Sequence, residues 1–193
     1  LQKTPGLLTT YDVLVNQTPI SQTIQRTEVD GLDLVPADKN LIGANFDLVN
    51  VENRETILRN QIQTLNGNYD YILIDCPPAL NMLTVNALTA TDFVLIPMQC
   101  EYFALEGIAD LLATLDRVRG ALNPGLVLEG VLLTMYDDRT NLGQQVGRNI
   151  REFFGEQVYE TVIPRNVRVS EAPSYGKPVL LYDLKSSGAQ AYL

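Results

Sequence analysis

The residues of this sequence that could do chemistry come directly after short apolar runs. The run Tyr71–Ile74 ends at Asp75, and Pro77 and Pro78 follow, so two fixed φ angles stiffen the chain beside the carboxylate. A carboxylate at the end of a buried strand can orient a magnesium-bound water next to a nucleotide. The alternative is that Asp75 caps the next turn or helix, a common use of aspartate.

A second group of charged residues lies in the C-terminal half. Arg139 stands in "YDDRTNL", and Arg165 and Arg168 stand in "IPRNVRVSEAPSYGKP". Three arginines on neighbouring loops could contact DNA phosphates, which need cations more than any particular sequence. The alternative is a solvated surface. The net charge of −9 argues against a general nucleic-acid coat protein, although half of the 14 Lys and Arg residues lie between Arg139 and Lys185.

Other chemistries are excluded by residue type. The sequence contains no His, so neither a Ser-His-Asp nor a Cys-His arrangement can form. Two cysteines are too few for a zinc site, and we predict that Cys76 and Cys100 are small buried residues. A phosphate-binding G-x-x-x-x-G-K-[ST] loop does not occur in the 193 residues. The sequence therefore carries half of a nucleotide site.

The elements that must position these residues alternate between strands and helices, which indicates an α/β fold with a mostly parallel, doubly wound sheet between two helical layers. The length of 193 residues suits one domain. Apolar runs rich in Val, Ile and Leu predict strands at Leu32–Val35, Tyr71–Ile74, Phe93–Ile96, Val127–Thr134 and Val158–Ile163.

Helical spacing of apolar residues predicts the connecting helices. They are expected at Glu52–Leu65, Leu83–Ala90, Leu105–Leu122 and Asn141–Phe154, with a further helix beginning near Gly188. Thr140 or Asn141 is the expected N-cap of the fourth helix and Gly155 its C-cap. The stretch from Ser170 to Leu181 is expected to be irregular.

Ligands of parallel α/β sheets bind at the carboxyl ends of the strands. This rule predicts one functional rim made of four segments, namely Asp75–Pro78, Pro97–Glu101, Met135–Thr140 and Pro164–Arg168.

The sequence has no apolar run approaching the roughly 20 residues that span a bilayer. It also has no signal peptide at its beginning, so a cytoplasmic location is expected.

The order of several segments resembles one family. The segments "TYDVL", "GLDLVPA", "LIGANFDLV", "YDYILIDCPPAL", "TVNALTATDFVLIPMQCEYFALEG", "LNPGLVLEGVLLTMYDDRTNL", "VIPRNVRVSEAPSYGKPVLLYD" and "SSGAQAYL" run nearly end to end. Together they resemble a ParA-type (Soj-like) partition ATPase of the MinD/ParA group of P-loop ATPases. The resemblance implies a P-loop NTPase-like fold and one partial domain over residues 1–193. The family's "KGGVGKT" and "DxDPQGN" motifs are absent, so we expect a sheet incomplete at its N-terminus and a final helix cut short.

The resemblance also implies roles for individual residues. Asp75 matches the carboxylate on the magnesium side, with Mg bound through water, and the loop that begins there matches a switch-like loop containing Pro77. The residues that match segments bordering the nucleotide are Met135, Pro164, Arg165 and Asn166. Glu101 matches a residue near the dimer interface that approaches the partner's nucleotide. Arg139 and Arg168 match arginines that bind DNA without sequence preference. Ala79 and Asn81 replace the Ser and Gly of the family's "DCPPSLG".

The function implied is DNA segregation. ATP and Mg would drive a homodimer that binds nucleoid DNA, a ParB-type partner would stimulate hydrolysis to ADP, and no membrane would be bound. Because the phosphate-loop motif is absent, we expect the 193-residue chain alone not to hydrolyse ATP. The alternative function is a naturally shortened regulator that binds DNA or a partner without nucleotide.

Overall fold

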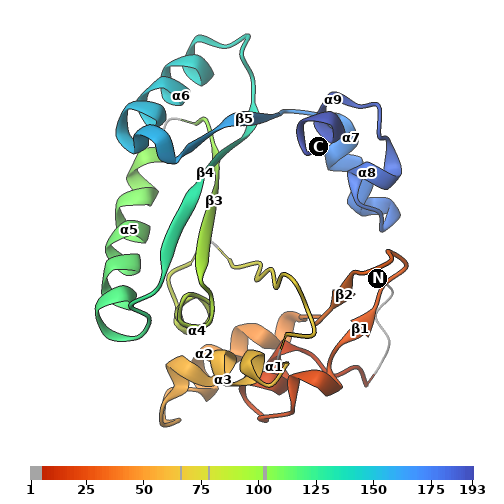
Figure 1. Ribbon diagram of the computed structural model, residues 1–193, viewed down its shortest axis with the longest axis vertical. Helices are drawn as coiled ribbons and strands as arrows, with labels where there is room; N and C mark the ends of the chain where they lie inside the picture. Colours follow the sequence, from red (N-terminus) through yellow and green to blue (C-terminus); the bar gives the residue numbers. More distant parts are fainter. Residues whose placement is uncertain (1–5, 66, 78, 102–103) are drawn as a thin grey trace. The chain divides into compact units, whose positions relative to one another are not determined.

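A computed structural model of the protein describes residues 6–65, 67–77, 79–101 and 104–193. The chain forms two compact units, which are described separately. The sheet unit comprises Phe93–Ala113 and Val127–Leu193, and the N-terminal unit comprises the described residues up to Asp92 together with Thr114–Leu126. Figure 1 shows the elements of both, from red at the N-terminus to blue at the C-terminus.

The sheet unit is built on three parallel strands in the order β3-β4-β5. Their bounds are Phe93–Gln99 for β3, Val127–Tyr136 for β4 and Val158–Pro164 for β5. All three were predicted from apolar runs, and each extends beyond the predicted range at its carboxyl end. The α/β class with a mostly parallel sheet is therefore confirmed.

Two long helices, α5 (Ala104–Ala121) and α6 (Asn141–Phe154), connect these strands (Figure 1). Residues of α6 such as Val146 and Ile150 form one buried cluster with strand residues such as Val131 and Leu133. The bounds of α6 match the prediction. The Thr140 side chain accepts a hydrogen bond from the Gly143 N–H at its start, and the chain leaves it at Gly155, whose φ is +58°.

The C-terminal segment is more regular than predicted. After β5 it forms α7 (Val167–Glu171), η5 (Ala172–Tyr175), α8 (Val179–Tyr182) and α9 (Ser187–Ala191), while η4 (Gly155–Gln157) lies between α6 and β5. The expectation of an irregular stretch from Ser170 to Leu181 was wrong because local caps support single helical turns. Asn166 accepts hydrogen bonds from the first N–H groups of α7, and α8 begins directly after Pro178.

The N-terminal unit consists of short elements. These are α1 (Thr10–Leu14), η1 (Ile20–Gln22), β1 (Gln25–Arg26), β2 (Asp33–Leu34), η2 (Lys39–Gly43), α2 (Ala44–Asp47), η3 (Arg54–Thr56), α3 (Ile57–Gln63) and α4 (Met82–Ala90). Strands β1 and β2 pair antiparallel. Asn86 is fully buried and joins α4 to α3, since its Nδ2 donates to the Arg54 carbonyl (2.8 Å) and its Oδ1 accepts from the Leu58 N–H (3.2 Å).

Three predictions were wrong in this unit. Tyr71–Ile74 is not a strand: it has no regular secondary structure and pairs with no described strand, and Tyr71 and Leu73 are 86% and 94% exposed. An apolar run becomes a strand only where a neighbouring strand offers partners for its backbone hydrogen bonds. The predicted helix Glu52–Leu65 starts only after Asn53, which has a left-handed backbone, and it is divided at Thr56 into η3 and α3. Cys76 is exposed, because the run before it is not buried.

No helix among the described residues is long and apolar enough to cross a membrane.

Candidate functional site

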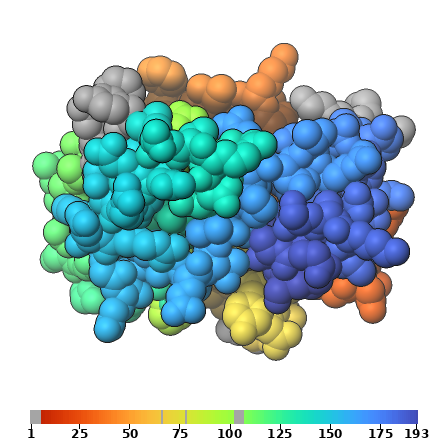
Figure 2. Space-filling view, turned by 90° about the horizontal axis from the view of Figure 1, so that it is seen from above, coloured from red at the N-terminus to blue at the C-terminus, as the bar shows by residue number. Residues whose placement is uncertain are grey.

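Three of the four predicted rim segments lie at one edge of the sheet unit. The segments Pro97–Glu101, Met135–Thr140 and Pro164–Arg168 fall at the carboxyl ends of β3, β4 and β5. The last two are directly joined, since Tyr136 pairs with Pro164 and the Arg165 N–H donates to the Tyr136 carbonyl (3.0 Å). Figure 2 shows the β4–α6 region (teal to cyan) beside the C-terminal segment (blue).

Met135, at this edge of the sheet, has a positive backbone φ angle, which is rare for a residue other than glycine. Its φ is +50°, in the left-handed region, and the pairing of β4 with β5 shifts register between Leu133 and Tyr136. For a residue with a Cβ this conformation costs about 1–2 kcal/mol. Met135 is also 39% exposed. Backbone strain of this kind clusters at ligand sites, so it favours a binding role for the loop that follows β4.

Arg139 is held by a carboxylate two residues before it. Its Nε donates to Asp137 Oδ1 and its Nη2 to Asp137 Oδ2, both at 2.8 Å, which is a bidentate ion pair. The Arg139 N–H also donates to Asp137 Oδ1 (3.1 Å). The side-chain and backbone hydrogen bonds from Arg139 lower the pKa of Asp137 from 3.8 to about 2. The Arg139 side chain is 83% exposed and can meet a ligand.

Arg168 lies at the start of α7 and also has carboxylate partners. Its Nη1 donates to Glu171 Oε2 (2.9 Å), and its Nε lies 3.4 Å from Asp183 Oδ2. The hydrogen bond to Glu171, followed by the charge of Glu171 and by Tyr182, raises the pKa of Arg168 above its usual range. Asn166 positions the turn, because its Oδ1 accepts from the Arg168 N–H (2.8 Å) and its Nδ2 donates to Ser187 Oγ (2.9 Å).

The remaining predicted site residues, Asp75, Pro77 and Glu101, lie outside helices and strands. Asp75 and Pro77 are exposed in a segment of the N-terminal unit without regular secondary structure, and Pro78 falls outside the described residues. Glu101 is exposed directly after β3, and its N–H donates to the Gln99 carbonyl (2.9 Å). Within the described part of the chain, no three His, Cys, Asp or Glu side chains are grouped so that they could hold a metal ion.

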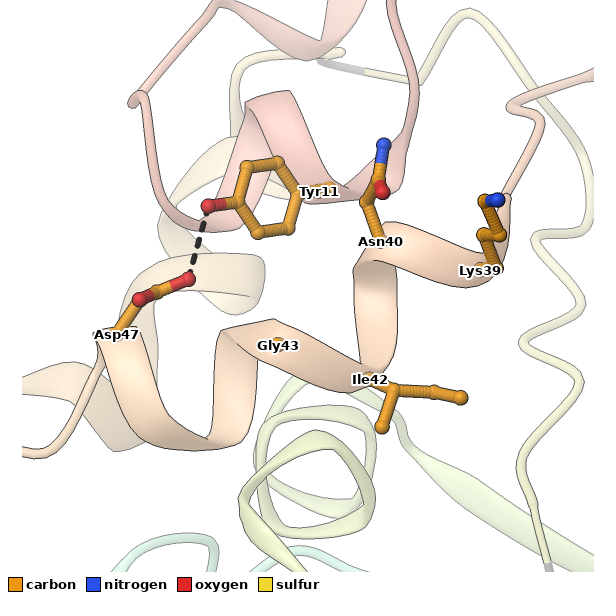
Figure 3. A pocket seen from close by; sticks show the side chains of 6 residues that line it. All are labelled: Tyr11, Lys39, Asn40, Ile42, Gly43 and Asp47. Carbon is orange, nitrogen blue, oxygen red and sulfur yellow. Dashed lines mark hydrogen bonds between the residues drawn. The ribbon is translucent and has the colours of Figure 1, made fainter.

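A hollow of about 620 Å³ in the N-terminal unit was not predicted (Figure 3). It is lined by Tyr11, Lys39, Asn40, Ile42, Gly43 and Asp47. Tyr11 points at Asp47 and its hydroxyl donates to Asp47 Oδ2 (2.8 Å), which is the main cause of a raised Tyr11 pKa. The hydroxyl proton of Tyr11 is thus already donated within the hollow, and Asn40 Nδ2 donates to Asp38 Oδ2 (3.2 Å).

Sequence reasoning also missed the carboxylates that hold the arginines, namely Asp137, Glu171 and Asp183. A signal for the first was available, since Asp two residues before another residue commonly accepts that residue's N–H in an Asx turn. Asp183 gave no such signal, because its approach to Arg168 depends on the fold of α7 and α8.

Comparison with known proteins gives consistent matches. A family model described as "AAA domain" matches residues 2–128. The chain is 54% identical over 193 residues to the chromosome partitioning protein ParA of Caulobacter vibrioides, covering 99% of this chain and 72% of that protein. It is also 54% identical over 183 residues to the sporulation initiation inhibitor protein Soj of Bacillus subtilis, covering 95% of this chain and 72% of Soj.

Solved structures show the same fold. A Mycobacterium smegmatis protein titled cobyrinic acid a,c-diamide synthase, solved with an ATP analog and magnesium, has a TM-score of 0.82 at 34% identity. The match covers 100% of this chain and 72% of that one. The cell division ATPase MinD of Pyrococcus furiosus has a TM-score of 0.76 at 23% identity, covering 98% of this chain and 73% of MinD, and supports the fold alone. The chain belongs to the ParA/Soj family of chromosome-partitioning ATPases.

Proposed function

We propose that this protein is a DNA-segregation ATPase that dimerises with ATP, binds DNA without sequence preference and hydrolyses ATP when a ParB-type partner stimulates it. The observation that carries the proposal is the 54% identity to the Caulobacter ParA over nearly the whole chain. The fold adds support, because the proposed nucleotide and DNA residues of the sheet unit share one edge of its sheet.

For the nucleotide, the residues present fit one side of ATP better than the other. The base side would be bordered by Met135, whose strained backbone suits a ligand site, and by the Pro164–Asn166 turn. The phosphate side has Asp75 and Pro77, both exposed. When bound, magnesium would neutralise phosphate charge, and Asp75 would hold it through water.

A phosphate cradle does not occur in the 193 residues, which contain neither a G-x-x-x-x-G-K-[ST] nor a G-x-G-x-x-G run. Backbone N–H groups and a lysine normally supply most of the binding to the phosphates. The 193-residue chain alone is therefore expected to bind ATP weakly and not to hydrolyse it.

For DNA, the proposed contacts are Arg139 and Arg168, which are exposed at the same sheet edge. Dimerisation with ATP doubles the arginines of one particle, and multiple phosphate contacts multiply affinity. Glu101 would lie near the dimer interface. A net charge of −9 lets the monomer leave DNA, so the nucleotide state would decide whether the protein is on the nucleoid or in the surrounding cytoplasm.

The test is binding of the protein produced from its complete gene to double-stranded DNA of random sequence, with ATP, with ADP and without nucleotide. We expect ATP-dependent binding that Arg139→Ala and Arg168→Ala each weaken about tenfold. Each substitution should also lower the slope of log Kd against log salt concentration by about 2, because a dimer carries two copies of each arginine. Arg26→Ala is the matched control, since Arg26 is an exposed arginine of the N-terminal unit.

Two results would contradict the proposal. Equal weakening by Arg26→Ala would show that only net charge matters and that the sheet edge is not the DNA surface. Equal binding with and without nucleotide would favour the second candidate, a regulator that binds DNA independently of ATP. The absence of a phosphate cradle in these residues is the observation that keeps this candidate open.

A further inference from the structure

Both arginines proposed to bind DNA are already occupied by carboxylates of the same chain. Arg139 uses Nε and Nη2 on the two oxygens of Asp137, and Arg168 uses Nη1 and Nε on Glu171 and Asp183. By contrast, the described residues give Arg165 no ion pair. The proposed DNA surface thus begins with much of its positive charge paired internally.

The pair between Arg139 and Asp137 has the geometry that a DNA phosphate would need. A guanidinium fork binds two oxygens of a carboxylate or of a phosphate in the same bidentate manner. The two anions therefore compete for the same N–H groups. A phosphate that binds through this edge of Arg139 must first displace the Asp137 carboxylate.

The loop keeps Asp137 in place while Arg139 can move. The Asp137 carbonyl oxygen accepts a hydrogen bond from the Thr140 hydroxyl (3.0 Å). Gly143 packs directly against the same carbonyl, because a Cβ atom added at Gly143 would lie only 2.7 Å from its oxygen. The side chain of Asp137 is 23% exposed and that of Arg139 83% exposed. The carboxylate is thus a fixed competitor, whereas the guanidinium is free to exchange partners.

We propose that Asp137 acts as an internal competitor for DNA phosphate at Arg139 and thereby lowers the affinity of the protein for nonspecific DNA. This inference rests on the proposed function and adds a regulation of the same site. Weaker binding per arginine makes release from DNA easier, which suits a protein whose attachment is meant to be reversible. Glu171 and Asp183 act in the same way at Arg168, with single rather than bidentate contacts.

The competitor is present at every pH at which the protein would work. Hydrogen bonds from Arg139, with a smaller contribution from the charge of the nearby Arg165, lower the pKa of Asp137 to about 2. Asp137 therefore stays ionised, and release of Arg139 needs a competing phosphate rather than a proton.

The test compares Asp137→Asn with Asp138→Asn in the protein produced from its complete gene. Asparagine keeps an oxygen that can accept the Arg139 N–H and so preserves the turn. Asp138 is an exposed neighbour, and its replacement changes the net charge equally without removing a hydrogen bond to Arg139. We expect Asp137→Asn to lower the Kd for random double-stranded DNA about fivefold at about 0.1 M salt, and Asp138→Asn to lower it less than about twofold.

A double-mutant cycle assigns the effect to the pair. With Arg139→Ala present, Asp137→Asn should change the Kd no more than Asp138→Asn does. Equal effects of the two asparagine substitutions in the presence of Arg139 would overturn the inference. Weaker binding by Asp137→Asn would also overturn it, because Asp137 would then position Arg139 for DNA. Circular dichroism would confirm that all variants are folded.

Elution from a heparin column separates this inference from the proposed function, since a sulfated polyanion reports the accessible arginine charge without ATP. Later elution of Asp137→Asn than of Asp138→Asn supports competition even if no form binds DNA, in which case the proposed function fails alone. Equal elution overturns the competition even if ATP-dependent DNA binding is found.

Discussion

Two regions of the molecule begin from similar sequences and reach different structures. The apolar run Tyr71–Ile74 leads to Asp75, and the apolar strand β4 leads to Asp137. Strand β4 pairs on both sides, with β3 and β5, and its Val131 and Leu133 are 0% and 1% exposed. The run Tyr71–Ile74 pairs with no described strand, and its Leu73 is 94% exposed.

The difference shows that an apolar run defines a strand only when the fold supplies edges to receive it. It also sets how firmly the following carboxylate is held. Asp137 is fixed by a turn and an ion pair, whereas no described residue holds the side chain of Asp75 in a hydrogen bond. Substitutions in the two regions should therefore differ in their effect on stability and on titration.

The largest expected difference is between Leu133→Ala and Leu73→Ala. Removing a fully buried leucine from β4 leaves a cavity and should cost about 3 kcal/mol of unfolding free energy, because its contacts are lost. The same change at the exposed Leu73 should cost less than about 0.5 kcal/mol. Urea denaturation of the 193-residue chain measures both. A loss at Leu73 as large as at Leu133 would mean that the run is packed in solution.

A second prediction concerns the contact between α3 and α4 in the N-terminal unit. Asn86→Ala should destabilise it by about 2–3 kcal/mol, since the Leu58 N–H and the Arg54 carbonyl would lose a buried partner. Asn16→Ala is the control, because Asn16 makes an exposed hydrogen bond to Asp12. Thermal unfolding followed by circular dichroism compares them. Equal shifts in Tm would show that Asn86 does not join α3 to α4.

A smaller effect is expected at the loop after β4. Thr140→Ala removes the N-cap of α6 and should lower the unfolding free energy by about 1 kcal/mol, because the Gly143 N–H loses its acceptor. Thr140→Ser keeps the hydroxyl and should be nearly neutral. The same urea titration distinguishes them, and equal losses for both variants would assign the effect to the methyl group rather than to the cap.

The smallest expected effect is the dependence of stability on the titration of Asp137. The pKa of Asp137 is lowered on folding, so its pairing with Arg139 stabilises the protein above the unfolded pKa of 3.8 and is lost as the pH falls toward about 2. Carboxyl NMR should therefore show a midpoint of about 2 for Asp137. Arg139→Ala should return that midpoint toward 3.8, whereas Arg168→Ala should leave it unchanged. An unshifted Asp137 in the unsubstituted protein would mean that the ion pair is not populated.

Sequence reasoning was strongest where local signals agree. Helix α6 was predicted in full because its apolar spacing, the cap at Thr140 and the stop at Gly155 coincide. The run Tyr71–Ile74 was wrong because strand pairing is not local. The positive φ of Met135 could not be predicted, since residues with a Cβ rarely adopt it. Residue type and placement pointed to Arg139, Arg165 and Arg168, and the family resemblance selected Arg139 and Arg168 as DNA-binding, but their carboxylate partners were found only in the structure.

The most direct test of the central claim is ATP turnover by the protein produced from its complete gene, with random DNA and with its ParB-type partner. We expect hydrolysis that both additions stimulate, a loss of turnover of at least about tenfold in Asp75→Asn, and no turnover by the 193-residue chain alone. Turnover by the 193-residue chain equal to that of the complete product, or no turnover by either, would contradict it.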